Sequence, residues 1–324
     1  MKTDLHQKET DMGKHEMKIF SCNSNKPLAE DIARRLGMNL ASSEVNKFKD
    51  EEIAVRINES VRGVDVFIIQ STCKPANNNL MELILMVDAA KRASARSITA
   101  VMPYFGYARQ DRKVEPRVPI SAKVVANLIQ ASGINRLLTM DLHADQIQGF
   151  FDLPVDNLFA SPLVIEYIRS MHIENMTIVS PDSGGVDRAR FIAKRLDAGL
   201  AIIDKRRPKA NVCEVMNVIG EVSGRNCVMI DDMIDTGGSI SGGAKALKEF
   251  GAKDVYCIAT HPVLSGNAFD NLSNAGFKEI IFSDTIPVDE SKKLDNMTVL
   301  PTAPLFAEAI KRIFNGESVS SLFI

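Results

Sequence analysis

Residues 227–239, with the sequence CVMIDDMIDTGGS, decide the fold. The apolar run at 227–230 is too short for a helix and lies between Arg225 and Asp231, which predicts a buried strand. Apolar residues then recur at helical spacing over 240–250. We therefore expect the acidic pair Asp231 and Asp232 at the carboxyl end of a strand, with the Thr-Gly-Gly-Ser turn at the start of a helix.

This strand-to-helix junction predicts a binding site for a sugar phosphate. In open α/β sheets, ligands bind beyond the carboxyl ends of the strands. A helix N-terminus offers free N–H groups and partial positive charge to a phosphate, and Gly237 and Gly238 allow its close approach. Thr236 and Ser239 add hydroxyl donors. Two carboxylates would repel a phosphate, so we expect them to serve sugar hydroxyls or a bridging cation.

The alternative interpretation of the junction is structural, because Asp, Thr and Ser are ordinary helix caps. Three aspartates in one turn count against it, since uncompensated like charges cost stability that a cap does not require. A P-loop kinase is excluded because no lysine follows a glycine at the Walker spacing.

Composition bounds the class of protein. The chain has 324 residues, 45% hydrophobic and 25% charged, which is an ordinary soluble composition with room for two domains. A net charge of −2 gives no general affinity for nucleic acid or an anionic membrane. Five cysteines without a Cys-x-x-Cys pair fit a reducing cytoplasm. Residues 1–16 lack the apolar segment of a secretory signal, and no run approaches a membrane span of about 20 apolar residues.

The rest of the chain alternates strands and helices. Strands are expected at 17–20, 52–57, 64–70, 97–102, 136–140, 176–179, 200–203, 255–259 and 279–282. Helices are expected at 27–36, 80–92, 119–132, 162–171, 186–196, 267–274 and 305–314. The alternation predicts an α/β fold with mostly parallel sheets flanked by helices. We expect a flexible extension at 1–16, a first domain at 17–160 and a second at 161–324, with a cleft between them where two substrates meet.

Two other segments are strongly basic. Arg109 and Gln110 follow a strand and an aromatic turn, and guanidinium groups bind phosphate oxygens bidentately, so we expect a polyphosphate there. The run DKRRPK at 204–209 could close over transferring phosphates and neutralise charge that develops in the transition state. The alternative for both segments is a solvated charged loop.

Two further strand exits carry possible metal ligands. His143 lies two residues after Asp141, and Asp182 precedes a glycine pair before a helix. If the two halves face each other, His143 and Asp182 could share one divalent cation, and oxygen-rich surroundings favour Mg²⁺. The alternative for His143 is a packed or capping histidine.

Taken together, these motifs resemble the class I ribose-phosphate pyrophosphokinases over essentially the whole chain from Met17. The matching segments are 59–63, 79–83, 103–112, 141–143, 146–151, 154–157, 205–208, 231–239 and 317–320. Type I phosphoribosyltransferases share only the loop at 231–239. The resemblance implies two phosphoribosyltransferase-like domains that transfer the diphosphoryl group of ATP to the anomeric hydroxyl of ribose 5-phosphate. The products would be AMP and 5-phosphoribosyl 1-diphosphate, for nucleotide, histidine and tryptophan biosynthesis.

The resemblance also implies roles for individual residues. The ATP-binding positions, partly supplied by a neighbouring subunit, would be Phe48, Asp50, Glu51, Glu52, Arg109 and Gln110. The Mg²⁺ carried by ATP would be bound by His143 and Asp182, and the catalytic cations would be Lys205 and Arg207. Ribose 5-phosphate would be bound by Arg207, Asp231, Asp232, Asp235, Thr236, Gly237, Gly238 and Ser239. No covalent nucleophile is expected, because phosphoryl transfer needs chiefly positioning and charge neutralisation.

The resemblance further implies a cytoplasmic hexamer in which ADP and phosphate act at a subunit interface. The matching positions are Ser60, Arg62, Ser318, Ser320 and Phe323, for which a surface turn and an ordinary tail are the alternative. Three residues depart from the family pattern. Glu51 replaces a usual glycine and could alter the backbone near the base, Asn78 replaces an aspartate, and Ser239 replaces a threonine but keeps the hydroxyl.

Two other functions stay open. A non-catalytic regulatory homologue would be expected to lose the cationic loop or the metal ligands, and Lys205, Arg207, His143 and Asp182 are all present. A phosphoribosyltransferase would need a nucleobase-specific segment, and none is apparent.

Overall fold

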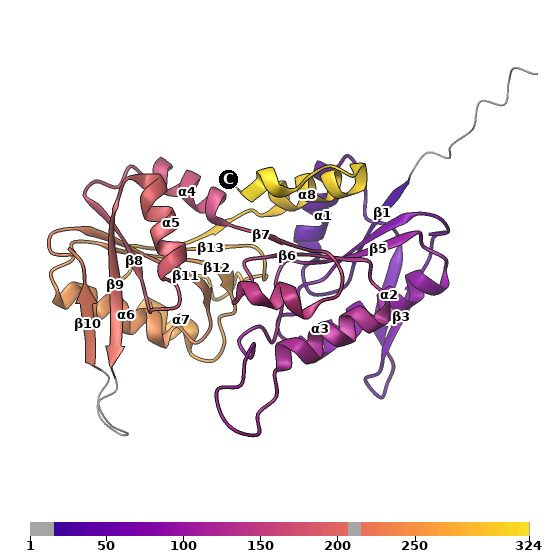
Figure 1. Cartoon of the computed structure of the whole chain (residues 1–324), viewed down its shortest axis with the longest axis horizontal. Helices are drawn as coiled ribbons and strands as arrows, with labels where there is room; N and C mark the ends of the chain where they lie inside the picture. The colour runs from indigo at the N-terminus through magenta and orange to yellow at the C-terminus, as the bar shows by residue number, and fades with distance from the viewer. Residues whose placement is uncertain (1–15, 207–214, 324) are drawn as a thin grey trace, which may run out of the picture.

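The computed structural model describes residues 16–206 and 215–323. Its main feature is a pair of β-sheets, each made mostly of parallel strands, that lie side by side (Figure 1). The first sheet has the order β1-β4-β5-β6-β7, with every neighbouring pair parallel. Its strands are β1 (Met17–Ser21), β4 (Asp65–Ile69), β5 (Ser97–Met102), β6 (Arg136–Met140) and β7 (Val155–Leu158). All five residues of β4 are buried, as expected for a central parallel strand covered on both faces.

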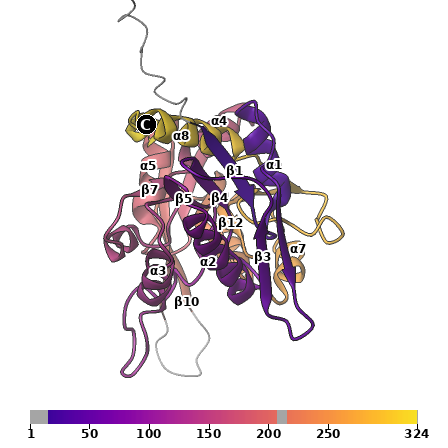
Figure 2. The same cartoon turned by 90° about the vertical axis from the view of Figure 1, so that its right-hand side faces the viewer.

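The second sheet has the order β10-β9-β8-β11-β12-β13-β14, and only the β9–β10 pair is antiparallel. Its strands are β8 (Met176–Ser180), β9 (Gly199–Arg206), β10 (Val215–Ile219), β11 (Asn226–Ile234), β12 (Val255–Pro262), β13 (Glu279–Ser283) and β14 (Met297–Leu300). A separate antiparallel hairpin of β2 (Ser43–Lys47) and β3 (Ile53–Ile57) packs against helix α2 (Ala76–Arg92) and projects from the first half (Figure 2).

Helices flank both sheets, which confirms the predicted α/β fold. They are α1 (Lys26–Arg35), α2 (Ala76–Arg92), α3 (Ser121–Ser132), α4 (Ser161–Ser170), α5 (Val186–Leu196), α6 (Gly238–Glu249), α7 (Ala268–Ser273) and α8 (Ala303–Asn315), with 3₁₀ turns η1 (Asp145–Phe150) and η2 (Ser320–Phe323). Local signals explain their limits: Asn25 caps α1 by accepting from Leu28 N, and Gly133 ends α3 with a φ of 111°. Among the described residues, no helix has the length and apolarity needed to cross a membrane.

The last helix of the chain packs on the first sheet, although it follows every strand of the second. Phe306 and Ile310 of α8 are fully buried in one apolar cluster with Ile19 of β1, Ile32 of α1 and Phe67 of β4. Figure 1 shows α8 lying beside α1 over the first half. The hydrophobic core on this face of the first sheet therefore includes residues of α8, which follows the second sheet in the chain. The domain boundary at residue 161 stays a prediction.

Strand β11 is longer than the sequence predicts. We expected it to end before Asp231, but its ladder with β12 continues, pairing Asp231 with Ala259 and Met233 with His261. Backbone pairing overrides the low strand propensity of aspartate here. The acidic pair therefore lies on the last residues of the strand rather than in the turn after it.

Candidate active site

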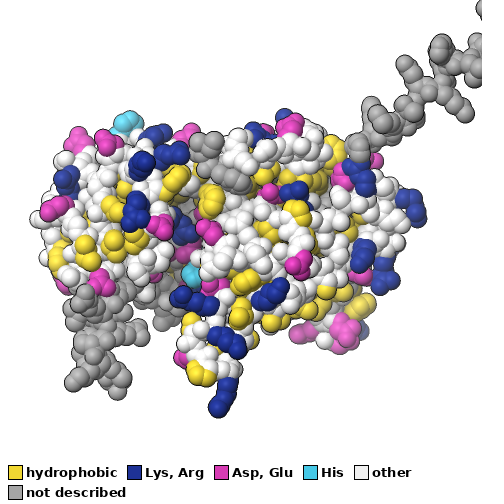
Figure 3. All heavy atoms as spheres, viewed as in Figure 1, with side chains coloured by type: hydrophobic (Ala, Val, Ile, Leu, Met, Phe, Trp, Pro, Cys, Tyr) yellow, Lys and Arg dark blue, Asp and Glu magenta, His cyan; other side chains and the backbone are white. Residues whose placement is uncertain are grey.

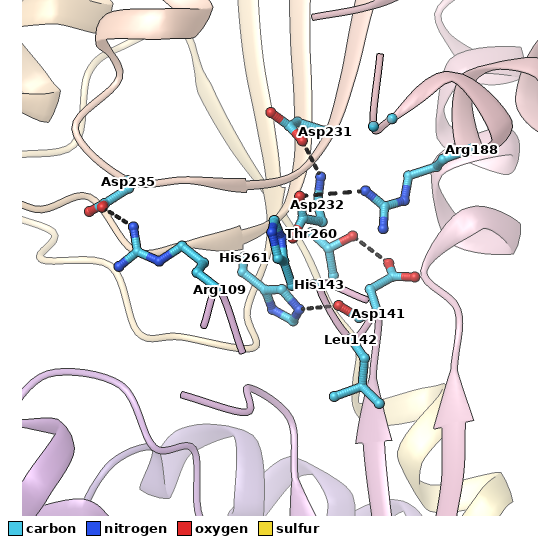
Figure 4. A network of polar contacts seen from close by, with 12 residues as sticks. Arg109, Asp141, Leu142, His143, Arg188, Asp231, Asp232, Asp235, Thr260 and His261 are labelled. Atoms are coloured by element: carbon cyan, nitrogen blue, oxygen red, sulfur yellow. Dashed lines mark hydrogen bonds and ion pairs between the residues drawn. The ribbon is translucent and has the colours of Figure 1, made fainter. Parts of the chain in front are cut away.

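The two halves of the molecule meet at a buried carboxylate, Asp232 of β11. Its Oδ2 lies 2.8 Å from Nδ1 of His143, which follows β6 of the first half (Figure 4). Its Oδ1 lies 3.7 Å from Nη1 of Arg188 on α5. Its own backbone N–H donates to Oδ1 of Asp231 at 2.8 Å. An imidazole and a guanidinium from separate elements thus converge on one end of the acidic pair.

The pKa values of the neighbouring carboxyls Asp231 and Asp232 are shifted in opposite directions. Burial, together with the charge of Asp232, raises the pKa of Asp231 well above its usual value. Burial acts on Asp232 in the same sense, but the hydrogen bond from His143 and the charge of Arg188 outweigh it and lower the pKa of Asp232 well below normal. The same hydrogen bond raises the pKa of His143. Asp232 is therefore the more acidic carboxyl of the pair, and Asp231 is the one that more readily holds a proton.

Side chains from three other segments hold the turn that precedes α6. The Asp235 carboxylate pairs with Arg109 and accepts a hydrogen bond from the Ser265 hydroxyl, and Asn271 Nδ2 donates to the carbonyl of Thr236 at 2.8 Å. Gly237 is buried at a φ of 73°, and an added Cβ would lie 3.3 Å from the carbonyl oxygen of Ala268. Only glycine adopts this conformation without strain.

Several residues of the same turn are exposed. Thr236, Gly238 and Ser239 are exposed at the N-terminus of α6, where backbone N–H groups have no partner within the helix. Lys and Arg side chains also gather on the loop before α3 and along the boundary between the halves (Figure 3). These features suit an anionic ligand with a phosphate at the helix start.

The structure does not pair His143 with Asp182. Asp182 instead accepts backbone hydrogen bonds through Oδ1 from Gly184 at 2.9 Å and Gly185 at 3.1 Å, which shape the turn before α5. Its charge still contributes to the raised pKa of Asp231, so it faces the same region.

In the described part of the chain, the two residues predicted to bind a metal ion lie outside any larger group of metal-binding side chains. Within residues 16–206 and 215–323, no group of three or more His, Cys, Asp or Glu side chains could hold a metal ion. The hydrogen bonds described above use Nδ1 of the half-exposed His143 and Oδ1 of Asp182, so Nε2 of His143 and Oδ2 of Asp182 are the atoms that could bind a cation. One or two protein ligands completed by substrate phosphates is the usual arrangement for Mg²⁺.

The predicted ATP-binding residues fall in two places. Phe48, Asp50, Glu51 and Glu52 form the exposed tip of the β2–β3 hairpin, where the Phe48 side chain is 61% exposed. Arg109 and Gln110 lie on the loop after β5, where Arg109 pairs with Asp235 and the Gln110 side chain accepts from the Ser121 hydroxyl. Arg109 thus adjoins the turn predicted for the sugar phosphate.

Glu51 has a left-handed backbone conformation, with a φ of 72°. This position is where the resemblance expects glycine, and an L-residue pays about 1–2 kcal/mol for that conformation. We expect Glu51→Gly to raise the free energy of unfolding by about 0.5–1 kcal/mol, after the larger unfolded-state entropy of glycine is subtracted. Urea unfolding measures this change. The control is Glu52→Gly, whose backbone is not left-handed, and a loss of stability in Glu51→Gly would contradict the expectation.

The predicted catalytic cations lie at the limit of the described chain. Strand β9 was expected to end at residue 203, but it continues to Arg206, and Lys205 pairs in register with Met216 of β10. The Lys205 side chain and the whole of Arg207 lie outside the described residues. Their roles stay predictions.

The predicted regulatory residues lie on two exposed segments. Ser60 and Arg62 are exposed in the turn before β4, and Ser318 and Ser320 are exposed after α8, where Arg312 Nη1 donates to the carbonyl of Ser318 at 3.1 Å. The side chain of Phe323 lies outside the described residues. These assignments also stay predictions.

Sequence reasoning missed Arg188 and the buried contacts of Asp141. Arg188 lies on a helix whose sequence resembles an ordinary charged surface, and only the fold turns it toward Asp232, Asp231 and Asp141. Asp141 accepts a hydrogen bond from Thr260 Oγ1 at 2.5 Å, across the boundary between the halves. The one available signal for Asp141 was its place at the end of an apolar strand.

Comparison with known proteins gives one consistent result. A family model described as the N-terminal domain of ribose phosphate pyrophosphokinase matches residues 17–133, and one described as the phosphoribosyl synthetase-associated domain matches residues 205–324. The ribose-phosphate pyrophosphokinase of Caldanaerobacter subterraneus subsp. tengcongensis is 57% identical over 308 residues, 95% of this chain and 98% of that protein. The corresponding protein of Ralstonia nicotianae is 56% identical over 314 residues, 96% of this chain and 99% of its own length.

A solved structure agrees. The crystal structure of phosphoribosylpyrophosphate synthetase from Mycobacterium smegmatis superposes with a TM-score of 0.89 at 44% identity, covering 93% of this chain and 99% of the other. Both the sequence and the arrangement of two sheets therefore match over nearly the whole length. The chain belongs to the ribose-phosphate pyrophosphokinase family.

Proposed function

We propose that the protein transfers the diphosphoryl group of ATP to the anomeric hydroxyl of ribose 5-phosphate, giving 5-phosphoribosyl 1-diphosphate and AMP. Membership of the family supports this reaction. The structural observation that carries it is the contact between His143 of the first half and Asp232 of the second, directly beside the turn before α6. In the proposed arrangement, that contact would bring the polyphosphate side and the sugar side of the reaction together.

Ribose 5-phosphate would bind along the end of β11 and the start of α6. The 5-phosphate would accept hydrogen bonds from the exposed N–H groups at the helix start and from the hydroxyls of Thr236 and Ser239. Asp231 and Asp232 would accept hydrogen bonds from the ribose hydroxyls. The ion pair of Asp235 with Arg109 supports this placement, because it removes the repulsion that a third free carboxylate would exert on the phosphate.

ATP would lie on the first half, against Arg109 and Gln110, with its base toward the residues of the hairpin tip, 48–52, which a neighbouring subunit would supply. His143 and Asp182 would hold the Mg²⁺ ion that accompanies ATP, and the ion would supply neutralisation of phosphate charge. Lys205 and Arg207 would stabilise the charge that develops on the transferring group. The sugar hydroxyl would attack the β-phosphorus directly, because positioning and charge neutralisation suffice for phosphoryl transfer.

Regulation and assembly follow as further parts of the proposal. The protein would act in the cytoplasm as a homo-oligomer, most simply a hexamer, with ADP and phosphate binding near Ser60, Arg62, Ser318, Ser320 and Phe323. The exposure of the four serine and arginine positions supports accessibility to such anions.

Incubation with ATP, Mg²⁺ and ribose 5-phosphate tests the reaction, with ³¹P NMR of the products. We expect AMP to form in step with 5-phosphoribosyl 1-diphosphate, without ADP, and to stop when the metal is chelated. ADP as the product would contradict diphosphoryl transfer, and no turnover would favour a regulatory homologue. Sizing in solution with and without phosphate tests the assembly.

A further inference from the structure

A buried histidine that the proposed reaction does not use lies where the two halves meet. His261 on β12 is 2% exposed, and its Nε2 lies 3.1 Å from the carbonyl oxygen of Met140 and 3.2 Å from that of Asp141. Both acceptors belong to the other half, at the end of β6. The ring of Tyr104 packs edge-on against the imidazole, with centroids 5.0 Å apart. One side chain of the second sheet therefore holds the last residues of a strand in the first.

The hydrogen-bond partners define the proton position on His261. Carbonyl oxygens only accept, so Nε2 must carry a proton and donate to both. Nδ1 lies 2.9 Å from the Thr285 hydroxyl. Because a neutral imidazole carries only one ring proton, Nδ1 is then an acceptor, and the Thr285 hydroxyl, which also lies 3.2 Å from the carbonyl of Thr260, is placed to donate to it. Burial lowers the pKa of His261, in keeping with this neutral, donating tautomer.

The backbone held by His261 is strained. Asp141 has a φ of 40°, a conformation that costs a non-glycine residue about 1–2 kcal/mol. Its Oδ2 accepts from Thr260 Oγ1 at 2.5 Å and from Ala160 N at 3.2 Å. Two adjacent residues of β12, Thr260 and His261, thus fix the side chain and the carbonyl of the same aspartate. Strain of this kind persists only when the surroundings over-determine it.

The strained turn leads directly to His143. We infer that His261 is a positioning residue, which clamps the carbonyls of Met140 and Asp141 so that His143 reaches Asp232. His261 touches neither substrate in the proposed arrangement and acts through the turn. The inference rests on the proposed function for its kinetic assay, and a spectroscopic readout is independent of it.

A double-mutant cycle separates positioning from a general loss of structure. His261→Leu removes both ring nitrogens, whereas His261→Gln keeps an amide donor near the place of Nε2. Each is made in the natural chain and in a His143→Ala chain. We expect His261→Leu to lower kcat/KM about 10- to 100-fold, since small misplacements of a reacting group have effects of that order. We expect kcat/KM of the His261→Gln variant to lie within about threefold of the natural chain. In the His143→Ala chain, His261→Leu should lower kcat/KM by less than about threefold.

The outcomes decide the inference even if activity is absent. With ¹³C-labelled histidine, the His143 ring resonance is assigned by its loss in His143→Ala among the five histidines. It should shift in His261→Leu and return in His261→Gln. The inference would be overturned if the losses of kcat/KM from His261→Leu and His143→Ala multiply in the double variant. It would also be overturned if the His143 ring resonance does not shift in His261→Leu. If His261→Leu does not fold, Thr285→Val takes its place, with a smaller loss that must also vanish in the His143→Ala chain. A natural chain that makes no AMP overturns the proposed function, and the resonance then decides the inference alone.

Discussion

Replacing Asp232 with asparagine should lower kcat/KM for ribose 5-phosphate by about 10- to 10²-fold, because it removes one charge-assisted hydrogen bond with His143, worth about 1.5–3 kcal/mol, and the ion pair with Arg188. Asparagine keeps the size of the side chain but removes the charge that pairs with His143 and Arg188. Steady-state kinetics with varied ribose 5-phosphate measures the effect. The matched control is Asp254→Asn, which breaks a surface ion pair with Lys278 and should leave kcat/KM unchanged.

The pH profile of the Asp232→Asn variant gives a second readout. The pKa of Asp231 is raised by burial and also by the charge of Asp232, so removing that charge should lower it. If the Asp231 carboxylate must be ionised to accept from the sugar, the acidic limb of the kcat/KM profile moves to lower pH in the variant. An acidic limb that stays in place would show that Asp231 does not control it.

Replacing Arg188 with methionine should lower the free energy of unfolding by about 2–3 kcal/mol at pH 8, because breaking a buried ion pair leaves its partner uncompensated. The Arg188 side chain is 25% exposed, and it faces the carboxylates of Asp232, Asp231 and Asp141. Urea unfolding of the two chains measures the difference. The matched control on the same helix is Arg190→Met, whose pair with Asp187 is exposed and should contribute less than about 0.5 kcal/mol.

The loss of unfolding free energy in the Arg188→Met variant should become smaller as the pH falls. The folded-state pKa of Asp232 is lowered, partly by Arg188, so its contribution to stability is present above the pKa of an unfolded aspartate, about 3.9, and is lost as pH falls through the lower folded value. The pKa of Asp231 is raised, so its ionisation costs stability as pH rises, and removing Arg188 increases that cost. Both effects make the variant weakest at high pH. A deficit independent of pH would show that Arg188 acts by packing alone.

Much of the fold could be predicted because apolar runs and helix caps are local signals. Strands β5 and β6 and helix α5 have the predicted limits. Two of the missed strands, β2, with the sequence SEVNK, and β10, are polar or marginal segments that become strands by antiparallel pairing with the adjacent β3 and β9. Intrinsic strand propensity is a weak guide where pairing and burial decide.

The site was predictable to the extent that its residues lie at strand exits. The acidic pair and His143 were singled out on that ground, and the structure joins them. Their partnership with Arg188 could not be predicted, because it depends on how α5 faces the end of β11. Nor could the clamp at Asp141 be predicted, since Thr260 and His261 lie about 120 residues further along the chain.

The burial of α8 against the first sheet has a consequence for biosynthesis. Ile19 and Phe67 are synthesised more than 200 residues before Phe306 and Ile310, which cover them. The amino-terminal half must therefore wait with an apolar face uncovered until α8 has been synthesised, and a nascent chain that stalls before residue 303 exposes that face to chaperones and proteases.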